Sequence, residues 1–260
     1  MRRHCTFACE GAMLLGTLDG AAGSTGLLIV SGGNEVRAGP WNAQALLAAR
    51  IAALGYPVFR FDRRGVGDSE GENRGFQGSA ADIAAALTAF REQAPQLTRI
   101  VGFGNCDGAA ALMLAEGAGC DALVLANPWT IESEAEGPPP AAIRAHYWRR
   151  LRDPAAVLRL LAGKVSPLKL VRSLAGAARM DRPRNTGLAG AIATGLARFG
   201  GRAAIVLAGR DRTAQVFLAR WDRSDPRLRH CAGADHSFSD PASFAWLEAQ
   251  IREALEAPAA

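Results

Sequence analysis

The chain has 260 residues, of which 49% are hydrophobic and 21% are charged. This balance is that of an ordinary globular protein, and it excludes disorder, collagen and coiled coil for the bulk of the chain. The 30 basic and 25 acidic side chains give a net charge of +5, and the sequence has no run of 18 uncharged apolar residues, so we expect no membrane-spanning helix. Because the N-terminal residues also lack the clean apolar core of a signal peptide, we expect a cytoplasmic protein.

The chain opens with a β-hairpin and then alternates between strands and helices. The hairpin is predicted at residues 2–9 and 12–18. Apolar runs predict strands at residues 26–30, 57–61, 100–103, 121–126 and 203–208, residues 226–231 are a candidate for a further strand, and helical patterns predict helices at residues 42–54, 80–93, 107–117 and 241–256. Strands that alternate with helices in this way form right-handed βαβ units. The expected fold class is therefore α/β, with a mostly parallel sheet covered by helices on both faces.

Residues 130–198 interrupt this alternation. They begin with an acidic, proline-rich turn and continue as basic helical sequence; residues 141–184 hold 11 basic and 2 acidic side chains, a local net charge of +9. We interpret the chain as a single domain spanning residues 1–260, with residues 130–198 inserted as a helical lid. The basic residues either form a solvated face or attract an anionic substrate or membrane surface. We expect no nucleic-acid partner, because an arginine-rich composition more often reflects the genome.

A strand-to-helix turn at Gly104-Asn105-Cys106-Asp107-Gly108 carries the candidate nucleophile. The pattern is that of a nucleophile elbow, G-x-S-x-G, with cysteine in place of serine. Such an elbow is sharp and strained, so only small residues fit two positions before and after the nucleophile. The N–H dipoles of the following helix favour a thiolate and stabilise developing negative charge. The alternative is a buried structural cysteine, since free cysteine packs as a small hydrophobe.

An acid and a histidine follow the elbow in an order known for such sites. Asp211 directly follows the predicted strand at residues 203–208, and His236 lies in a loop before the terminal helix. The order nucleophile, acid, histidine is one of those found for catalytic triads. We therefore expect a triad of Cys106, Asp211 and His236, with Asp211 also suited to cap a helix. Asp235 is the rival acid, but as the neighbour of His236 it is badly placed to reach the imidazole ring.

The oxyanion hole is expected to consist of backbone amides. One comes from Asp107, directly after the nucleophile, and the other from the loop after the first parallel strand. In that loop we favour Asn34 as the donor, followed by Gly33.

Substrate contacts are expected from aromatic residues near the elbow and in the lid. Trp129 follows a predicted strand, and His146 and Trp148 lie in the basic segment. A lid helix that packs its aromatic face on the core is the alternative for the last two. No cofactor or metal is expected, because Gly102-Phe103-Gly104 lacks the third glycine of a dinucleotide-binding motif and the cysteine spacings match no zinc pattern.

Five segments of the sequence together carry a family resemblance. They are Phe61-Asp62-Arg63-Arg64-Gly65-Val66-Gly67-Asp68-Ser69-Glu70-Gly71, Cys106-Asp107-Gly108-Ala109, Leu125-Ala126-Asn127-Pro128-Trp129, Gly209-Arg210-Asp211-Arg212-Thr213-Ala214-Gln215 and Gly233-Ala234-Asp235-His236-Ser237-Phe238. Over nearly its whole length the chain resembles an α/β hydrolase, and more narrowly it is similar to the exosortase A system-associated hydrolases of type 1, which accompany bacterial exopolysaccharide and protein-sorting genes. The resemblance implies a hydrolase-type triad at Cys106, Asp211 and His236 and no established substrate. One departure is Gly32, where many members of the wider superfamily carry histidine.

Together these residues predict a hydrolase acting on a small-molecule acyl ester or thioester. The acyl group would be held on Cys106 as a covalent acyl-enzyme. Because that intermediate is a thioester, which also reacts with alcohols and amines, an acyltransferase is an open alternative. The other alternative is a non-catalytic scaffold with the hydrolase fold, which predicts an unreactive Cys106.

Overall fold

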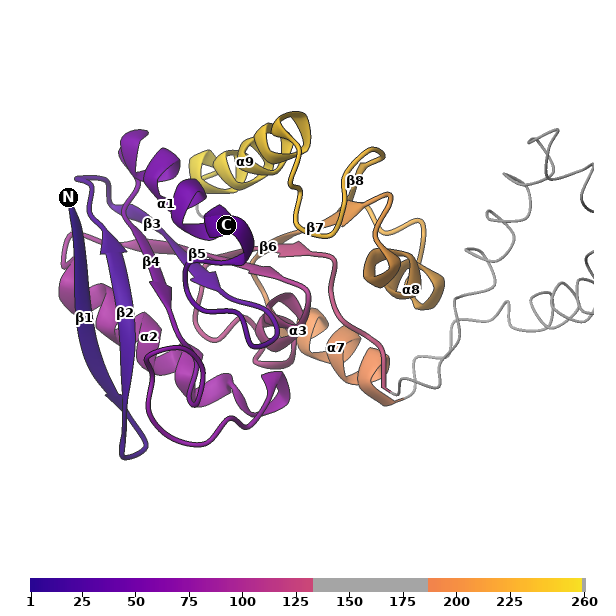
Figure 1. Ribbon diagram of the computed structural model, residues 1–260. Coiled ribbons are helices and arrows are strands. Elements are labelled where there is room, and N and C mark those ends of the chain that lie inside the picture. The colour runs from indigo at the N-terminus through magenta and orange to yellow at the C-terminus, as the bar shows by residue number, and fades with distance from the viewer. Residues whose placement is uncertain (133–186, 259–260) are drawn as a thin grey trace, which may run out of the picture.

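The computed structural model describes residues 1–132 and 187–258. In these residues eight strands form one sheet, in the order β1-β2-β4-β3-β5-β6-β7-β8 (Figure 1). The strands are β1 (Arg2–Cys9), β2 (Ala12–Asp19), β3 (Thr25–Val30), β4 (Val58–Phe61), β5 (Arg99–Asn105), β6 (Ala122–Ala126), β7 (Arg202–Ala208) and β8 (Leu228–Cys231). β2 is antiparallel to both β1 and β4, and the other neighbouring strands are parallel. The sheet confirms the predicted α/β class.

The antiparallel edge of the sheet is the predicted hairpin. Glu10 and Gly11 join β1 to β2 with φ angles of 46° and 83°. A two-residue hairpin turn with two successive positive φ angles matches the twist of the flanking strands, and glycine adopts that backbone at little cost. The hairpin extends the sheet beyond β4, on the side away from β6, β7 and β8.

Helices cover both faces of the sheet (Figure 1). One face carries α1 (Ala43–Ala53) and α9 (Pro241–Glu256), and the other carries α2 (Ala80–Gln93), α3 (Asp107–Leu114), α7 (Gly187–Arg198) and α8 (Arg212–Arg220). Two short 3-10 helices, η1 (Pro40–Asn42) and η2 (Phe76–Gly78), lie in the loops. No helix among residues 1–132 and 187–258 is long and apolar enough to cross a membrane.

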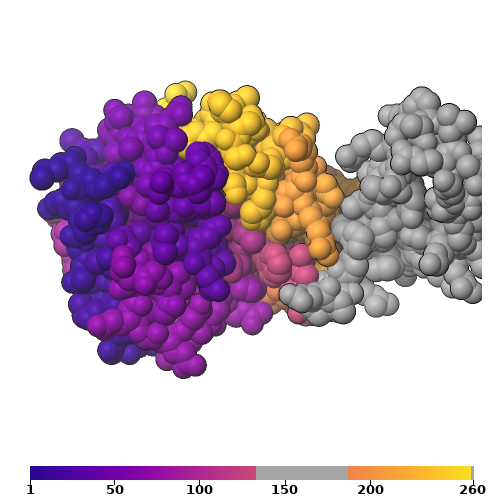
Figure 2. Space-filling model, in the orientation of Figure 1, coloured from indigo at the N-terminus to yellow at the C-terminus, as the bar shows by residue number. Residues whose placement is uncertain are grey.

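The first and last helices of the chain pack against each other. Nε of Arg50 in α1 lies 2.6 Å from Oε2 of Glu248 in α9. The space-filling view shows the C-terminal residues, in yellow, directly against the purple N-terminal ones (Figure 2). The C-terminal helix therefore completes the layer that the N-terminal part of the chain begins.

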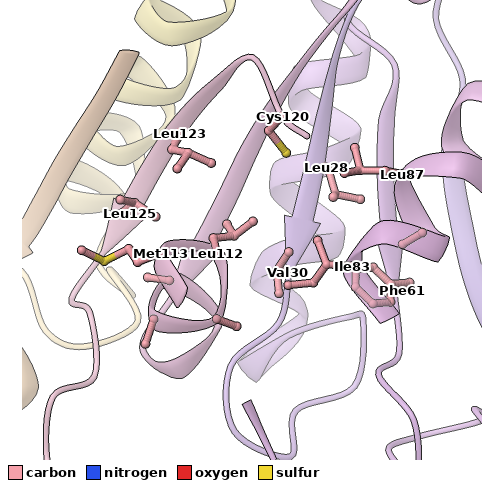
Figure 3. Close-up of a cluster of buried hydrophobic side chains, with 14 of the residues drawn as sticks. Leu28, Val30, Phe61, Ile83, Leu87, Leu112, Met113, Cys120, Leu123 and Leu125 are labelled. Carbon is pink, nitrogen blue, oxygen red and sulfur yellow. The ribbon is translucent and has the colours of Figure 1, made fainter. Parts of the chain in front are cut away.

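The central strands are buried on both faces, as their continuous apolar sequences predict. In β3, Leu28 and Val30 face the layer of α2 and α3, whereas Leu27 and Ile29 face α1 and α9; all four are fully buried. This alternation follows from the two-residue period of a strand. Figure 3 shows the first of these clusters, where residues of β3, α2 and α3 interdigitate.

Helix α7 lies within residues 130–198, the range expected to form an inserted lid. Its buried Leu188, Ile192 and Leu196 recur at helical spacing and belong to the same core cluster as α3. The described end of this range is therefore part of the α/β core. Residues 133–186, which include His146, Trp148 and the basic segment, lie outside the described residues.

Candidate active site

Cys106 stands at the turn between β5 and α3, as the elbow pattern predicts. Its φ and ψ angles are 59° and −124°, outside the regions that non-glycine residues normally occupy. A Cβ added at Gly104 would lie 2.6 Å from N of Ala109, and one added at Gly108 would lie 2.4 Å from O of Val30. Neither contact is sterically allowed, so the two glycines are what lets the turn close between the strand and the helix. The turn presents Cys106 at the carboxyl edge of the parallel strands.

His236 reaches this edge from the loop between β8 and α9. Its Nδ1 lies 3.0 Å from Oδ2 of Asp211, whose side chain is only 7% exposed. Asp211 also caps α8, because its two carboxylate oxygens accept the N–H groups of Thr213 and Ala214 at 3.2 and 3.0 Å. The acid that contacts His236 is thus Asp211. The rival, Asp235, instead accepts the N–H of Ser239 at 2.9 Å.

His236 forms hydrogen bonds with both of the other predicted triad residues. Hydrogen bonds with the Asp211 carboxylate and with the Cys106 side chain raise the pKa of His236 from 6.5 to about 10, while partial burial opposes the rise. Because Nδ1 is directed at Asp211, Nε2 is the ring atom left for the thiol. The structure therefore brings Cys106, His236 and Asp211 into one connected group.

The loop after β3 lies against the elbow. A Cβ added at Gly32 would lie 2.6 Å from O of Asn105 and 3.2 Å from Cβ of Cys106. The backbone at Gly32 thus approaches the elbow more closely than a side chain at this position allows, so this chain needs glycine here.

Gly33 is held between Arg63 and Asp107. Its N–H donates to Oδ1 of Asp107 at 2.5 Å, and its carbonyl oxygen accepts from Nη2 of Arg63. Arg63 is almost completely buried, and its Nη2 also lies 3.6 Å from Oδ1 of Asp107. Gly33 is one of the two predicted oxyanion-hole donors in this loop, and its N–H is already bonded to the Asp107 carboxylate. The Asn34 side chain accepts a hydrogen bond from Asn73 at 2.8 Å.

Glu35 brings a further carboxyl group close to the site. Burial raises the pKa of Glu35, and the neighbouring Asp107 adds to that rise, whereas the charges of His236 and Arg63 oppose it. Glu35 lies two residues after Gly33, in the same loop.

Trp129 lies beside the elbow, at the start of the segment that leaves β6. Its backbone N–H donates to the carbonyl oxygen of Cys106 at 3.2 Å. Its indole N–H donates to the carbonyl oxygen of Ile131 at 2.9 Å, and its ring packs against the core. The other two predicted substrate contacts, His146 and Trp148, lie outside the described residues.

A small cavity lies behind the His236 loop. It has a volume of about 30 Å³ and is lined by residues of β5, α1, α9 and the loop, including Asn105 and Ser237. This space is enough for about one or two water molecules. Cys106 is not among the residues that line it.

Several polar residues at the site were not assigned a role from the sequence. They are Glu35, Arg63, Asn105, Asn127 and the carboxylate of Asp107. One signal was available for Asn105 and Asn127, which end neighbouring parallel strands, because ligand sites form at the carboxyl ends of such strands. In the part of the chain that is described, no group of three or more histidine, cysteine, aspartate or glutamate residues could hold a metal ion.

Comparisons with known proteins agree with this architecture. The model of the alpha/beta hydrolase family matches residues 27–245. The chain therefore belongs to the alpha/beta hydrolase family. No curated protein matches it.

Solved structures of similar shape include an esterase and a thioesterase. The esterase Pf2001 of Pyrococcus furiosus has a TM-score of 0.60 at 16% identity, with 98% of this chain and 90% of that chain covered. The thioesterase domain from the curacin biosynthetic pathway has a TM-score of 0.58 at 14% identity, with 96% and 99% covered. The alpha/beta hydrolase GrgF from Penicillium sp. sh18 has a TM-score of 0.63 at 17% identity, with 97% and 98% covered. At these identities the likeness shows the fold.

Proposed function

We propose that this alpha/beta hydrolase cleaves ester or thioester bonds through a triad of Cys106, His236 and Asp211. The observation that carries the proposal is the hydrogen-bonded connection from Asp211 through His236 to Cys106 at a strained elbow. A nucleophile, a base and a residue that orients the base are the parts that covalent acyl transfer requires. The similar fold of an esterase and of a thioesterase supports the same class of reaction.

The first half of the reaction forms an acyl-enzyme. Nε2 of His236 takes the proton from Cys106, and the sulfur bonds to the carbonyl carbon of the substrate while the carbonyl electron pair moves to oxygen. Asp211 keeps the ring in the correct tautomer and stabilises its positive form. When the oxyanion collapses, the bond to the leaving alcohol or thiol breaks and His236 returns the proton to it.

The second half releases the acyl group. A water molecule attacks the thioester carbonyl as His236 accepts one of its protons, and collapse of the second oxyanion expels the sulfur of Cys106, which regains the proton. In both halves the oxyanion is held by the backbone amides of Asp107 and Asn34. We favour Asn34 over Gly33 because the N–H of Gly33 is already bonded to the Asp107 carboxylate.

The proposal extends to the setting in which the enzyme works. All five cysteines are free thiols, which favours a reducing, cytoplasmic compartment. The resemblance to the exosortase A system-associated hydrolases favours a substrate connected with exopolysaccharide biosynthesis. The basic residues at 141–184 favour an anionic substrate or an anionic membrane surface as the partner.

A labelling experiment tests the nucleophile. The protein is incubated with iodoacetamide at graded pH, and mass spectrometry follows each cysteine. We expect Cys106 to react faster than Cys231, a half-buried cysteine in the same molecule, at pH 7 and below. His236→Ala should abolish that advantage, whereas His230→Ala, at an exposed histidine of β8, should leave it unchanged. Equal labelling of Cys106 and Cys231 would favour the non-catalytic scaffold.

An activity assay separates the hydrolase from the acyltransferase. Turnover of p-nitrophenyl esters and of an acyl thioester is measured with and without added alcohol acceptors. For the wild type we expect hydrolysis, and for Cys106→Ala a loss of roughly 10³-fold or more. Acyl transfer to the alcohol in preference to water would assign the same cysteine to an acyltransferase. Unchanged turnover in Cys106→Ala would place the nucleophile elsewhere.

A further inference from the structure

One buried side chain, that of Asn127, contacts the segments that carry the three proposed catalytic residues. Asn127 follows β6, is fully buried, and has a φ angle of 44°. Asparagine tolerates this left-handed backbone better than most residues. A fully buried amide must have its donors and acceptor satisfied, so its partners reveal what holds it there.

The acceptor of Asn127 is bonded to the segment that leads to Asp211. Its Oδ1 accepts the N–H of Ala208, the last residue of β7, at 2.8 Å. The carbonyl oxygen of Ala208 accepts the N–H of Asp211 at 3.1 Å. Through Ala208, Asn127 is therefore linked to the backbone of Asp211, the acid of the proposed triad.

The donor group of Asn127 is bonded to the histidine loop and to the elbow. Its Nδ2 donates to the carbonyl oxygen of His236 and to Oδ1 of Asn105, both at 3.1 Å. Nδ2 of Asn105 donates to the same carbonyl oxygen at 3.2 Å. The backbone of His236 is thus held by two amide groups, and one of these belongs to the residue that precedes Cys106.

The orientation of both amides is determined by their partners. Because Oδ1 of Asn127 must face the N–H of Ala208, its Nδ2 faces the carbonyl oxygen of His236. Because Oδ1 of Asn105 accepts from Asn127, the Nδ2 of Asn105 faces the same carbonyl oxygen. No other arrangement of the two amides satisfies all four bonds. The network therefore requires asparagine, with a donor and an acceptor, at both positions.

We propose that Asn127 and Asn105 are positioning residues that hold the His236 backbone where its ring meets both Asp211 and Cys106. The inference rests on the proposed function. Neither amide is directed at the reacting atoms; both act through the carbonyl group of His236. A displacement of about 1 Å in a catalytic group can cost roughly 10²-fold in rate, so two hydrogen bonds on this carbonyl are enough to matter.

The test removes the donors while keeping the shape of the side chains. Asn105→Leu and Asn127→Leu remove the donors with an uncharged branched side chain of similar size, so that no new charge acts on His236. Asn42→Leu is the matched control, because Asn42 is exposed, has a left-handed φ of 63° and lies outside the site. NMR titration of His236, the pH profile of Cys106 labelling, and kcat and KM for a p-nitrophenyl ester are measured for each variant.

We expect the site variants to lower kcat by roughly 10²-fold with little change in KM. The pKa of His236 should fall from about 10 toward 6.5, because the ring loses its hydrogen bonds to Asp211 and Cys106. Asn42→Leu should match the wild type. Thermal unfolding is recorded in parallel, and the half-buried Asn105 provides a folded variant should the change at Asn127 prevent folding.

Two negative outcomes have separate meanings. If Asn105→Leu and Asn127→Leu lower the melting temperature but leave the His236 titration and kcat unchanged, the two asparagines are merely structural and the inference is wrong. If His236→Ala labels Cys106 as fast as the wild type does, the proposed function fails. The His236 titration of the asparagine variants then still decides whether they position the ring against Asp211.

Discussion

Nδ1 of His236 lies 3.0 Å from Oδ2 of Asp211, and the same Oδ2 accepts the N–H of Ala214 in the first turn of α8. One carboxylate thus orients the imidazole ring and caps a helix. The helix N-terminus in turn stabilises the negative charge of Asp211. The two tasks differ in what they require, since capping needs an oxygen acceptor and the imidazolium needs a charge.

Substitutions at Asp211 should separate these two tasks. Asp211→Asn keeps an acceptor for the helix and removes the charge, and asparagine caps helices about as well as aspartate. We expect ester turnover to fall by roughly 10³-fold or more, and stability to fall only by what the ion pair with protonated His236 contributes. Asp211→Ala should lose a similar amount of activity and in addition about 1 kcal/mol of stability. Urea unfolding and ester turnover check both; equal stability of the two variants would exclude the capping role.

The pKa of His236 predicts how stability depends on pH. Because the folded state raises this pKa from 6.5 to about 10, the proton is bound more tightly in the folded chain than in the unfolded one. The contribution to stability is fully present below about pH 6.5 and is lost as the pH rises through about 10. We expect the difference in unfolding free energy between wild type and His236→Gln to be largest at the low end of this window.

Urea unfolding at several pH values between 6.5 and 10 measures this difference. His230→Gln is the matched control, since it removes an exposed histidine in β8. The His230→Gln difference should stay constant over the window. A His236→Gln difference that grows with pH would contradict the raised pKa.

Arg63 should be essential to the geometry of the Gly33 loop. Its side chain is 5% exposed, contacts Asp107 and donates to the carbonyl oxygen of Gly33. Removing one partner of a buried ion pair leaves the other charge without compensation, which costs about 3–5 kcal/mol. We expect Arg63→Ala to lose stability toward the lower end of that range and to lower turnover, because the loop beside the elbow is released.

The matched control for Arg63 is Arg74. Arg74 also pairs with a carboxylate, Glu10, but its side chain is 55% exposed. An exposed pair contributes at most about 1 kcal/mol, so Arg74→Ala should change stability little. Chemical denaturation of the two variants makes the comparison, and equal losses would show that burial of Arg63 has no energetic weight.

The contact between Gly32 and the elbow predicts the effect of a single methyl group. In Gly32→Ala the new Cβ would lie 2.6 Å from the carbonyl oxygen of Asn105, so the loop or the elbow has to move. We expect kcat to fall by at least about 10-fold, since Cys106 is displaced from His236. Gly200→Ala is the control, because an added Cβ there meets nothing within 4 Å. Wild-type turnover in Gly32→Ala would mean that the loop yields without disturbing the nucleophile.

The elements that the sequence predicted best are those with local causes. The elbow follows from glycines at fixed offsets around Cys106, because steric exclusion at a sharp turn leaves no other choice. The proximity of His236 to Asp211 follows from topology, because the loops after β7 and β8 lie at the same edge of the sheet. The hairpin turn at Glu10-Gly11 is equally local.

Contacts between distant segments could not be predicted in this way. The hydrogen bond from Gly33 to Asp107 joins residues 74 positions apart, and neither residue carries a pattern that announces it. Helix α7 is a different case. Leu188, Ile192 and Leu196 have helical spacing, but their place after a basic, proline-containing segment hid their membership of the core.

The side chain of Glu132 accepts the backbone N–H of Leu188 at 2.6 Å, so the described residues on the two sides of positions 133–186 lie next to each other. A connection whose two ends meet can change in length at small entropic cost, since closing a loop grows more expensive only slowly with its size. A few glycines joining residue 132 to residue 188 would bridge the gap without straining β6 or α7. The number of residues between 132 and 188 can therefore change while β6 and α7 keep their places in the core.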